Sequence, residues 1–221
     1  MNMQNNSGQP ERGGRSWGLV LLLLIGAVFV IIMLLLRRPV TDSSPAVEAL
    51  PRLGAVPAFA LTDAGGTTIT LDALKGKIWV ADFIFTKCGG TCPMMTSTLY
   101  QVNQDLDPSL GVQLVSISVD PENDTPEVLK AYADNNSLPR ERWYFLTGTR
   151  DAIHELAKNG FHLAVSDSGT TQRLITHSSK LAVVDRSGQI RAYYDGTDTL
   201  AAREVRTAIA RLMLEPEGKD R

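Results

Sequence analysis

The sequence predicts an α/β domain preceded by one membrane-spanning helix. Three observations support this fold class. An apolar run without charges covers residues 17–36, and a near-continuous run of β-branched and aromatic residues follows at 77–86. Beyond it, segments with the periodicity of helices and strands alternate to the end of the chain. A long buried strand followed by alternating elements is typical of a sheet that helices cover on both faces.

The apolar run is long enough to cross a bilayer. It contains 20 residues, and at about 1.5 Å rise per residue a helix of this length spans about 30 Å. A cleaved signal peptide is the alternative, but its apolar region usually has only about 7–15 residues. The run ends in Arg37-Arg38-Pro39, without a small-residue cleavage site or the cysteine of a lipoprotein signal. We therefore expect an uncleaved, single-pass anchor.

Charge does not orient this anchor, because Arg12 and Arg15 on one side nearly balance Arg37 and Arg38 on the other.

The chain has 22 basic and 24 acidic residues, and four of the bases and one of the acids precede Pro39. The part from Pro39 onward therefore has 18 basic and 23 acidic residues. No basic block alternates with aromatic residues, so nucleic acid is not an expected partner. The predicted organisation is a polar segment (1–16), a transmembrane helix (17–36), a linker (37–51), one folded domain (52–214) and a tail (215–221).

The folded part shows a regular succession of elements. Residues 77–86 (KIWVADFIFT) and 111–119 (GVQLVSISV) are typical of strands buried on both faces. Asp124-Thr125-Pro126-Glu127 has the N-cap and first-turn proline of a helix start. Arg186-Ser187-Gly188 separates two strand patterns and predicts a hairpin. The predicted strands are 77–86, 111–119, 143–146, 161–165, 180–185 and 189–194, and the predicted helices are 96–106, 124–135, 150–159 and 198–214.

This order predicts a partly parallel sheet that an antiparallel hairpin closes. A thioredoxin-like fold has the same layout, with inserted elements, and it carries reactive cysteines directly after a central strand. Cys88 is in that place, and Cys92 is the only other cysteine. Two cysteines are too few for a disulfide scaffold, so their proximity indicates a redox pair or a metal site.

The residues around the cysteines predict a loop followed by a helix. Gly89-Gly90 disfavours helix by about 1 kcal/mol per glycine, and Pro93 biases Cys92 away from helical dihedral angles. We therefore expect Cys92 at a helix N-cap, where the helix dipole favours thiolate. Two inert, buried cysteines are the alternative, but a Gly-Gly loop at a strand end is a poor place for them.

A metal site needs further ligands. His154 lies within a predicted helix and His162 within a predicted strand, and both are interpreted as surface or packing residues. His177 ends a polar loop just before the hairpin strand, and in a thioredoxin-like sheet that loop passes beside the cysteines. Two thiolates with one imidazole suit Cu(I) and accept Cu(II) with an added ligand, whereas structural zinc usually takes four protein ligands.

Met94 and Met95 follow the second cysteine closely. Neighbouring helix positions point about 100° apart, so at most one of the two faces a metal at this place. We interpret both as core residues.

Four motifs taken together resemble those of the Sco/SenC family, membrane-anchored copper proteins that take part in assembling the CuA centre of cytochrome c oxidase. The resemblance covers about residues 57–212. FIFTKCGGTCPMM is similar to the family's CxxxCP segment, and VSISVDPENDTPEVLKAYA to its DPxxDTPxxLxxY stretch. WYFLTGT and LITHSSKLAVVDRSGQIRAYYDGTD are similar to its WxFLTG and HS…VD…G…YDG segments.

The resemblance implies that Cys88, Cys92 and His177 bind copper as Cu(I), Cu(II) or both, and that the two cysteines also form a redox disulfide. It implies a soluble domain in the bacterial periplasm or the mitochondrial intermembrane space, and the lack of an Arg- and Ser-rich presequence favours a bacterial cell membrane. Subunit II of cytochrome c oxidase is the expected partner, beside other copper chaperones and thiol reductants. The chain departs from many relatives at Gly89, where they have proline, and at His154, where some have an acidic residue.

Two functions remain open on these grounds. The first is a metallochaperone, not an enzyme in the usual sense, which passes copper to an oxidase subunit by ligand exchange. The second is a thiol-disulfide oxidoreductase that keeps the cysteines of the oxidase subunit reduced, for which His177 is dispensable. A peroxidase is a weaker third option, since neither Thr91 nor an arginine is placed to support a peroxidatic cysteine.

Overall fold

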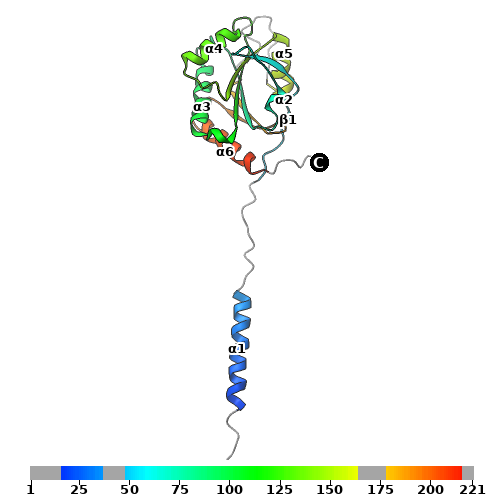
Figure 1. Ribbon diagram of the computed structural model, residues 1–221, viewed down its shortest axis with the longest axis vertical. Coiled ribbons are helices and arrows are strands. Elements are labelled where there is room, and N and C mark those ends of the chain that lie inside the picture. Colours follow the sequence, from blue (N-terminus) through cyan, green and yellow to red (C-terminus); the bar gives the residue numbers. More distant parts are fainter. Residues whose placement is uncertain (1–15, 37–47, 164–177, 216–221) are drawn as a thin grey trace, which may run out of the picture. The chain divides into compact units, whose positions relative to one another are not determined.

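A computed structural model describes residues 16–36, 48–163 and 178–215 of the chain (Figure 1). Helix α1 (Ser16–Leu36) contains an 18-residue stretch, Trp17–Leu34, with a mean hydropathy of 3.0 and none of it buried. By length and composition this helix is able to cross a membrane, as the sequence predicts. The predicted polar segment before it, most of the linker and most of the C-terminal tail lie outside the described residues.

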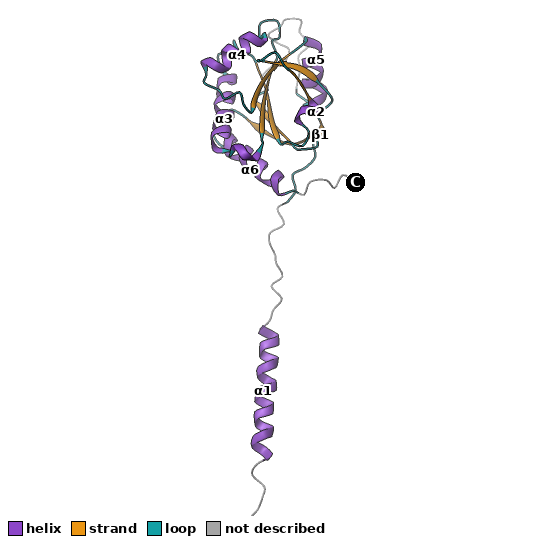
Figure 2. Ribbon diagram, viewed as in Figure 1, coloured by secondary structure: helices purple, strands orange, loops and turns teal. Residues whose placement is uncertain are grey.

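The strands of the folded part form one mixed sheet (Figure 2). Across the sheet the described strands have the order β1-β8-β7-β4-β5-β6-β2-β3. β4 pairs in parallel with β5, and β5 with β6, while the β7–β8 hairpin joins β4 in antiparallel orientation. The bounds are β1 Gly54–Ala55, β2 Ala60–Asp63, β3 Thr68–Thr70, β4 Trp79–Ile84, β5 Gln113–Ser118, β6 Trp143–Thr147, β7 Lys180–Val184 and β8 Gln189–Asp195.

Helices cover both faces of this sheet (Figure 1). Val80 and Ile84 of β4 point into a core with three helices, whereas Trp79, Ala81 and Phe83 point to the opposite face, as the alternation of a strand requires. The first face carries α3 (Thr91–Asp105), α4 (Pro126–Asn135) and α6 (Ala201–Leu214), and the second α2 (Leu71–Leu74) and α5 (Arg150–Glu155), which continues as a π-helical turn, Leu156–Gly160. The predicted partly parallel sheet with helices on both faces is confirmed.

One predicted strand is absent from the described residues, and four short elements were not predicted. Residues 161–163, the described part of the predicted strand 161–165, form no strand: Phe161 packs into the core and His162 has a φ of 52°. That left-handed conformation ends the chain's helical path and is incompatible with a strand. The sequence analysis did not predict strands β1 to β3 or the short helix α2. β1 extends the sheet at one edge, and β2 and β3 extend it at the other.

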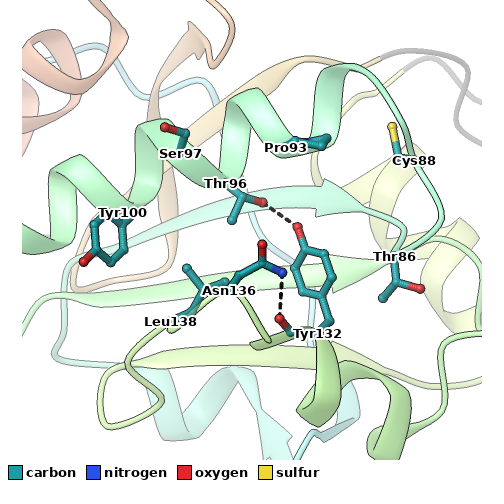
Figure 3. A pocket seen from close by; sticks show the side chains of 9 residues that line it. All are labelled: Thr86, Cys88, Pro93, Thr96, Ser97, Tyr100, Tyr132, Asn136 and Leu138. Carbon is teal, nitrogen blue, oxygen red and sulfur yellow. Dashed lines mark hydrogen bonds between the residues drawn. The ribbon is translucent and has the colours of Figure 1, made fainter. Parts of the chain in front are cut away.

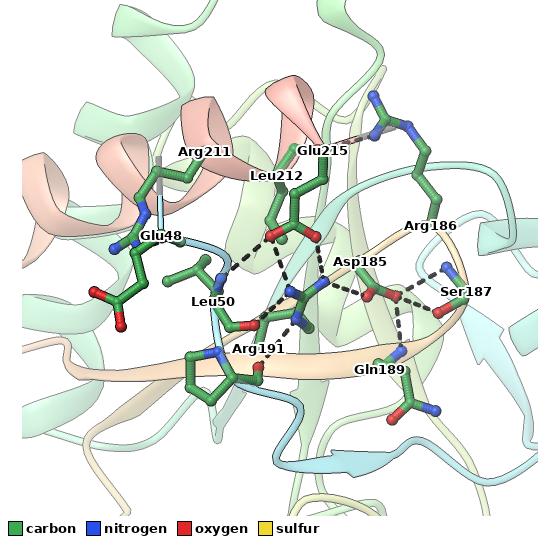
Figure 4. Close-up of polar contacts among 11 residues, drawn as sticks. Glu48, Leu50, Asp185, Arg186, Ser187, Gln189, Arg191, Arg211, Leu212 and Glu215 are labelled. Carbon is green, nitrogen blue, oxygen red and sulfur yellow. Dashed lines mark hydrogen bonds and ion pairs between the residues drawn. The ribbon is translucent and has the colours of Figure 1, made fainter. Parts of the chain in front are cut away.

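A buried arginine holds together the two ends of the domain (Figure 4). The Arg191 side chain is 4% exposed and pairs with Asp185 and Glu215, each at 2.8 Å. Its guanidinium also donates to the carbonyl oxygens of Leu50, at 2.5 Å, and Pro51, at 3.0 Å. With the bond from the Leu50 backbone N–H to Glu215 at 3.2 Å, this cluster fixes where the chain reaches the sheet and where α6 ends.

Candidate metal centre

The loop after β4 carries the first cysteine. Strand β4 ends at Ile84, and the backbone N–H of Cys88 donates to the carbonyl oxygen of Phe85 at 3.1 Å, which turns the chain. Cys88 is half-buried, and both Gly89 and Gly90 are exposed. A side chain built on either glycine would meet no atom within 4 Å. The thiol of Cys88 therefore stands on an open loop that a metal ion or another protein can reach.

The second cysteine lies inside the helix and not at its N-cap, which corrects the sequence prediction. The N-cap of α3 is Gly90, and Cys92 is the second helical residue. Pro93 does not prevent this, because in the first turn of a helix its missing N–H has no partner to lose. Cys92 is only 6% exposed, and its backbone N–H donates to the Sγ of Cys88 at 3.4 Å. Both cysteines are free thiols in the structure.

The two thiols differ in acidity. Partial burial raises the pKa of Cys88, but hydrogen bonds from Cys92 and from the backbone N–H groups of Gly90 and Thr91 outweigh it, so the pKa is lowered. Burial raises the pKa of Cys92 to about 12, and its hydrogen bond to Cys88 and the nearby negative charges of Cys88 and Asp82 act in the same direction. Cys88 is therefore the more accessible and more acidic thiol and Cys92 the protected partner, an arrangement that suits a redox pair or an unsaturated metal site.

The third predicted ligand, His177, lies outside the described residues. Within residues 16–36, 48–163 and 178–215, no cluster of three histidine, cysteine or acidic side chains is placed to bind a metal ion. His154 is half-buried on α5, on the sheet face opposite to α3, and His162 is exposed beside Gly54. The structure thus brings together Cys88 and Cys92 and leaves these two histidines on other elements.

The two methionines have different positions. Met95 is fully buried in the core between α3 and the sheet, as expected, but Met94 is 51% exposed. The interpretation of Met94 as a core residue is therefore wrong. The 100° step between neighbouring helix positions turns it to solvent once its neighbour faces the core.

A buried carboxylate braces the cysteine loop, and sequence reasoning missed it. Asp124 is 0% exposed and accepts hydrogen bonds from the backbone N–H of Thr86 at 3.0 Å, from the Thr86 hydroxyl at 2.5 Å and from the Ser118 hydroxyl at 2.6 Å. Thr125 caps α4 instead, since its hydroxyl accepts from the Val128 N–H. Asp124 thus links Thr86, which follows β4 and lies two residues before Cys88, to Ser118 at the end of β5. The helix-start pattern around it gave no sign of this second role.

Replacing Asp124 by asparagine is expected to lower the free energy of unfolding by about 2 kcal/mol. The amide keeps the shape of the side chain, but its NH₂ group must reverse the bond to the Thr86 hydroxyl, and all three charge-assisted hydrogen bonds become weaker neutral ones. Denaturant unfolding of the full chain in detergent measures the effect. Asp107→Asn is the matched control, since Asp107 is exposed and accepts a hydrogen bond from the nearby Ser109 N–H. An equal, small effect of both substitutions would contradict the bracing role.

Comparison with known proteins assigns the family. The SCO1/SenC family model matches residues 49–214. The chain belongs to this family. It is 36% identical over 142 residues to the SCO1 protein homolog of Bacillus subtilis (strain 168), a match that covers 63% of this chain and 73% of that protein.

Solved structures of Sco proteins share the fold. BsSco, a member of the Sco family of cytochrome c oxidase assembly proteins in which a disulfide switch was identified, is similar with a TM-score of 0.67 and 31% identity, over 76% of this chain and 100% of that chain. ScoI of Bradyrhizobium japonicum, solved with copper bound, matches with a TM-score of 0.58 and 23% identity, over 72% and 99%. The fold is therefore the thioredoxin-like α/β fold of the Sco family, and the predicted family and fold are confirmed.

Proposed function

We propose that this protein binds copper through Cys88, Cys92 and His177 and passes it on during the assembly of cytochrome c oxidase. The observation that supports this most directly is that the accessible thiol of Cys88 and the buried thiol of Cys92 lie next to each other after the end of β4, in a member of the SCO1/SenC family. Soft thiolates are the ligands that Cu(I) prefers. Solved Sco relatives with copper bound support the choice of metal.

The two thiols have complementary tasks in this proposal. Cys88 lies on an open loop, so the ligands of a receiving protein can approach the ion from its side. Cys92 is fixed by α3 and keeps its place while ligands are exchanged. Copper is then transferred through an intermediate in which ligands of both proteins bind the same ion. A site whose ligands were all buried would block this transfer.

We also assign the remaining parts of the chain by proposal. Helix α1 crosses the cell membrane once and anchors the protein there. Residues 52–214 are the copper-binding domain on the periplasmic side, and residues 37–51 are the linker between the two. The length and apolar composition of α1 support the anchor. Subunit II of cytochrome c oxidase is the proposed receiver, with other periplasmic copper chaperones or thiol reductants as further partners.

Thiol-disulfide exchange is the second candidate function, and the unequal thiols favour it. A half-buried thiol of lowered pKa on an open loop, beside a buried thiol of raised pKa, is the arrangement in which Cys88 attacks a partner's disulfide and Cys92 then resolves the mixed disulfide. The two roles are compatible, because both copper binding and exchange start from the reduced pair.

The copper proposal is tested by titrating the full chain in detergent with Cu(I) against a competing chelator, once reduced and once with the Cys88–Cys92 disulfide formed. We expect the reduced protein to bind one copper ion per chain and the oxidised protein to lose most of this affinity, because a disulfide sulfur is a much weaker ligand than a thiolate. Equal binding by both forms, or by neither, would overturn the proposal and leave a redox dithiol.

A further inference from the structure

A cleft lies beside Cys88, between α3 and α4 (Figure 3). It has a volume of about 280 Å³, and Cys88 and Thr86 form one end of it. Tyr100 and Leu138 lie at the other end, and Thr96 of α3 and Tyr132 of α4 lie between the two ends. Cys88, the more accessible of the two cysteines, thus lines one end of a preformed depression of the surface.

Apart from Cys88, which reacts as a thiolate, the lining of this cleft carries no charge. None of its nine residues has a carboxylate, an ammonium, a guanidinium or an imidazole group. Two tyrosines, a proline and a leucine supply apolar surface, and hydroxyl and amide groups supply the polar contacts. Away from Cys88, a charged ligand would lose hydration without gaining an opposite charge, so this part of the cleft favours an uncharged one.

The polar groups of the cleft are held in place, and among the described residues no donor bonds to the amide oxygen of Asn136. The Tyr132 hydroxyl and the Thr96 hydroxyl bond to each other at 3.0 Å, and the Asn136 amide nitrogen donates to the Tyr132 carbonyl oxygen at 2.8 Å. Figure 3 shows the amide oxygen of Asn136 pointing toward α3. An oxygen in this position is suited to accept a hydrogen bond from a backbone N–H of a bound peptide.

The length of the cleft indicates a peptide and not a small thiol. Along α3 it extends from Pro93 to Tyr100, which at about 1.5 Å per residue is about 10 Å. About three residues of extended chain cover the same distance. A cysteine seated against Cys88 would therefore place its neighbours in the cleft.

We propose that this cleft binds a short, uncharged segment of a partner protein that carries a cysteine. The proposal extends the proposed function, but it rests on the position of Cys88 at one end of the cleft and not on copper. When the partner's cysteine is in a disulfide, the Cys88 thiolate attacks one of its sulfurs, the partner's S–S bond breaks and its other sulfur leaves as a thiolate. Cys92 then gives its proton to the departing thiolate and attacks the Cys88 sulfur. The mixed disulfide breaks, a Cys88–Cys92 disulfide forms, and the partner is released with both sulfurs reduced by the two electrons of the Cys88–Cys92 dithiol.

The far side of α3 offers a matched control. A second cleft of about 470 Å³ lies there, against the turn between β8 and α6, and Asp198 is among its lining residues. Tyr100 lines the first cleft and its neighbour Gln101 the second. Both are on the surface of the same helix, so a glutamate at either position adds the same charge to the same element.

The test uses the full chain in detergent with Cys92→Ala, which traps the mixed disulfide on Cys88. The probes are the symmetric disulfide of acetyl-Leu-Ala-Cys-Ala-Leu-amide, the same peptide with glutamate in place of both leucines, and 2-hydroxyethyl disulfide, which is too small to reach Tyr100. Mass spectrometry gives the rate of mixed-disulfide formation. The 2-hydroxyethyl disulfide rate normalises each peptide rate for the reactivity of Cys88.

We expect the neutral peptide to react about tenfold faster than the acidic one, and Tyr100→Glu to slow the neutral peptide about tenfold without changing the small disulfide. Gln101→Glu should leave both rates within about twofold. The inference is overturned if both peptides react alike, or if Gln101→Glu slows the neutral peptide as much as Tyr100→Glu. Failure of copper binding with these preferences intact would instead remove the proposed function alone.

Discussion

Alanine in place of Cys88, Cys92 or His177 is expected to lower the affinity of the reduced protein for Cu(I) by about a hundredfold or more. A three-coordinate site that loses one ligand must take up water, which is a hard ligand and a poor one for Cu(I). The measurement is the competition titration with a Cu(I) chelator, carried out on each variant in its reduced state. The two cysteines are expected to have the larger effects, since they supply the soft ligands.

The other two histidines serve as controls for this experiment. His154→Ala and His162→Ala should bind copper like the unchanged protein, because α5 and the turn after it carry these residues away from the cysteine loop. If His177→Ala retains full affinity, the proposed ligand set is wrong. A variant that loses copper but still exchanges thiols with a small disulfide would show that His177 serves the metal and not the redox chemistry.

The central sheet was predictable because its strands are long and buried on both faces. The six residues of β4 and the six of β5 are all buried, and both strands are rich in β-branched, aromatic and other apolar residues, a pattern that was visible in the sequence. Strands β1, β2 and β3 have two, four and three residues and lie toward the edges of the sheet. Such short strands depend on pairing with distant partners, here β8 and β6, and leave no periodic pattern.

The candidate site was predictable as far as it is local. The spacing of Cys88 and Cys92, the strand before them and the helix after them all lie within one segment of sequence. The bond from Thr86 to Asp124 joins residues 38 positions apart, and neither residue alone indicates it. The start of α3 was misplaced because Pro93 was interpreted as a barrier to helix, although the first turn tolerates it.

The sequence of β4 also contained a signal that the interpretation left unused. Asp82 is the charged residue within the strand's six buried positions, and it is 0% exposed. By the alternation of the strand it points to the face of Val80 and Ile84, toward the core that also contains Cys92. Within the described part of the chain, neither of its carboxylate oxygens has a hydrogen-bond partner of normal geometry.

Burial raises the pKa of Asp82 from 3.8 to about 7, and the Ser116 hydroxyl and the backbone N–H of Asp82 offset only part of this. In the unfolded chain the carboxyl ionises near its ordinary pKa of 3.8. Between about pH 4 and pH 7 the folded protein therefore holds a proton that the unfolded chain has lost, so stability falls as the pH rises. The stabilisation is fully present below about pH 4 and is lost once the pH has risen through 7. Between pH 5 and pH 8 the free energy of unfolding is expected to fall by about 3 kcal/mol from this group.

The Asp82→Asn variant is expected to exceed the free energy of unfolding of the unchanged protein by a margin that is about 3 kcal/mol larger at pH 8 than at pH 5. The amide resembles the protonated carboxyl in shape and never carries the buried negative charge. Denaturant unfolding of both proteins at the two pH values, on the full chain in detergent, measures the difference, and other titrating groups cancel in the comparison. Asp72→Asn is the control, since the Asp72 side chain is 79% exposed and pairs with Lys75 on the surface. A stability gap between the Asp82 variant and the unchanged protein that is the same at both pH values would mean that Asp82 does not titrate in this range.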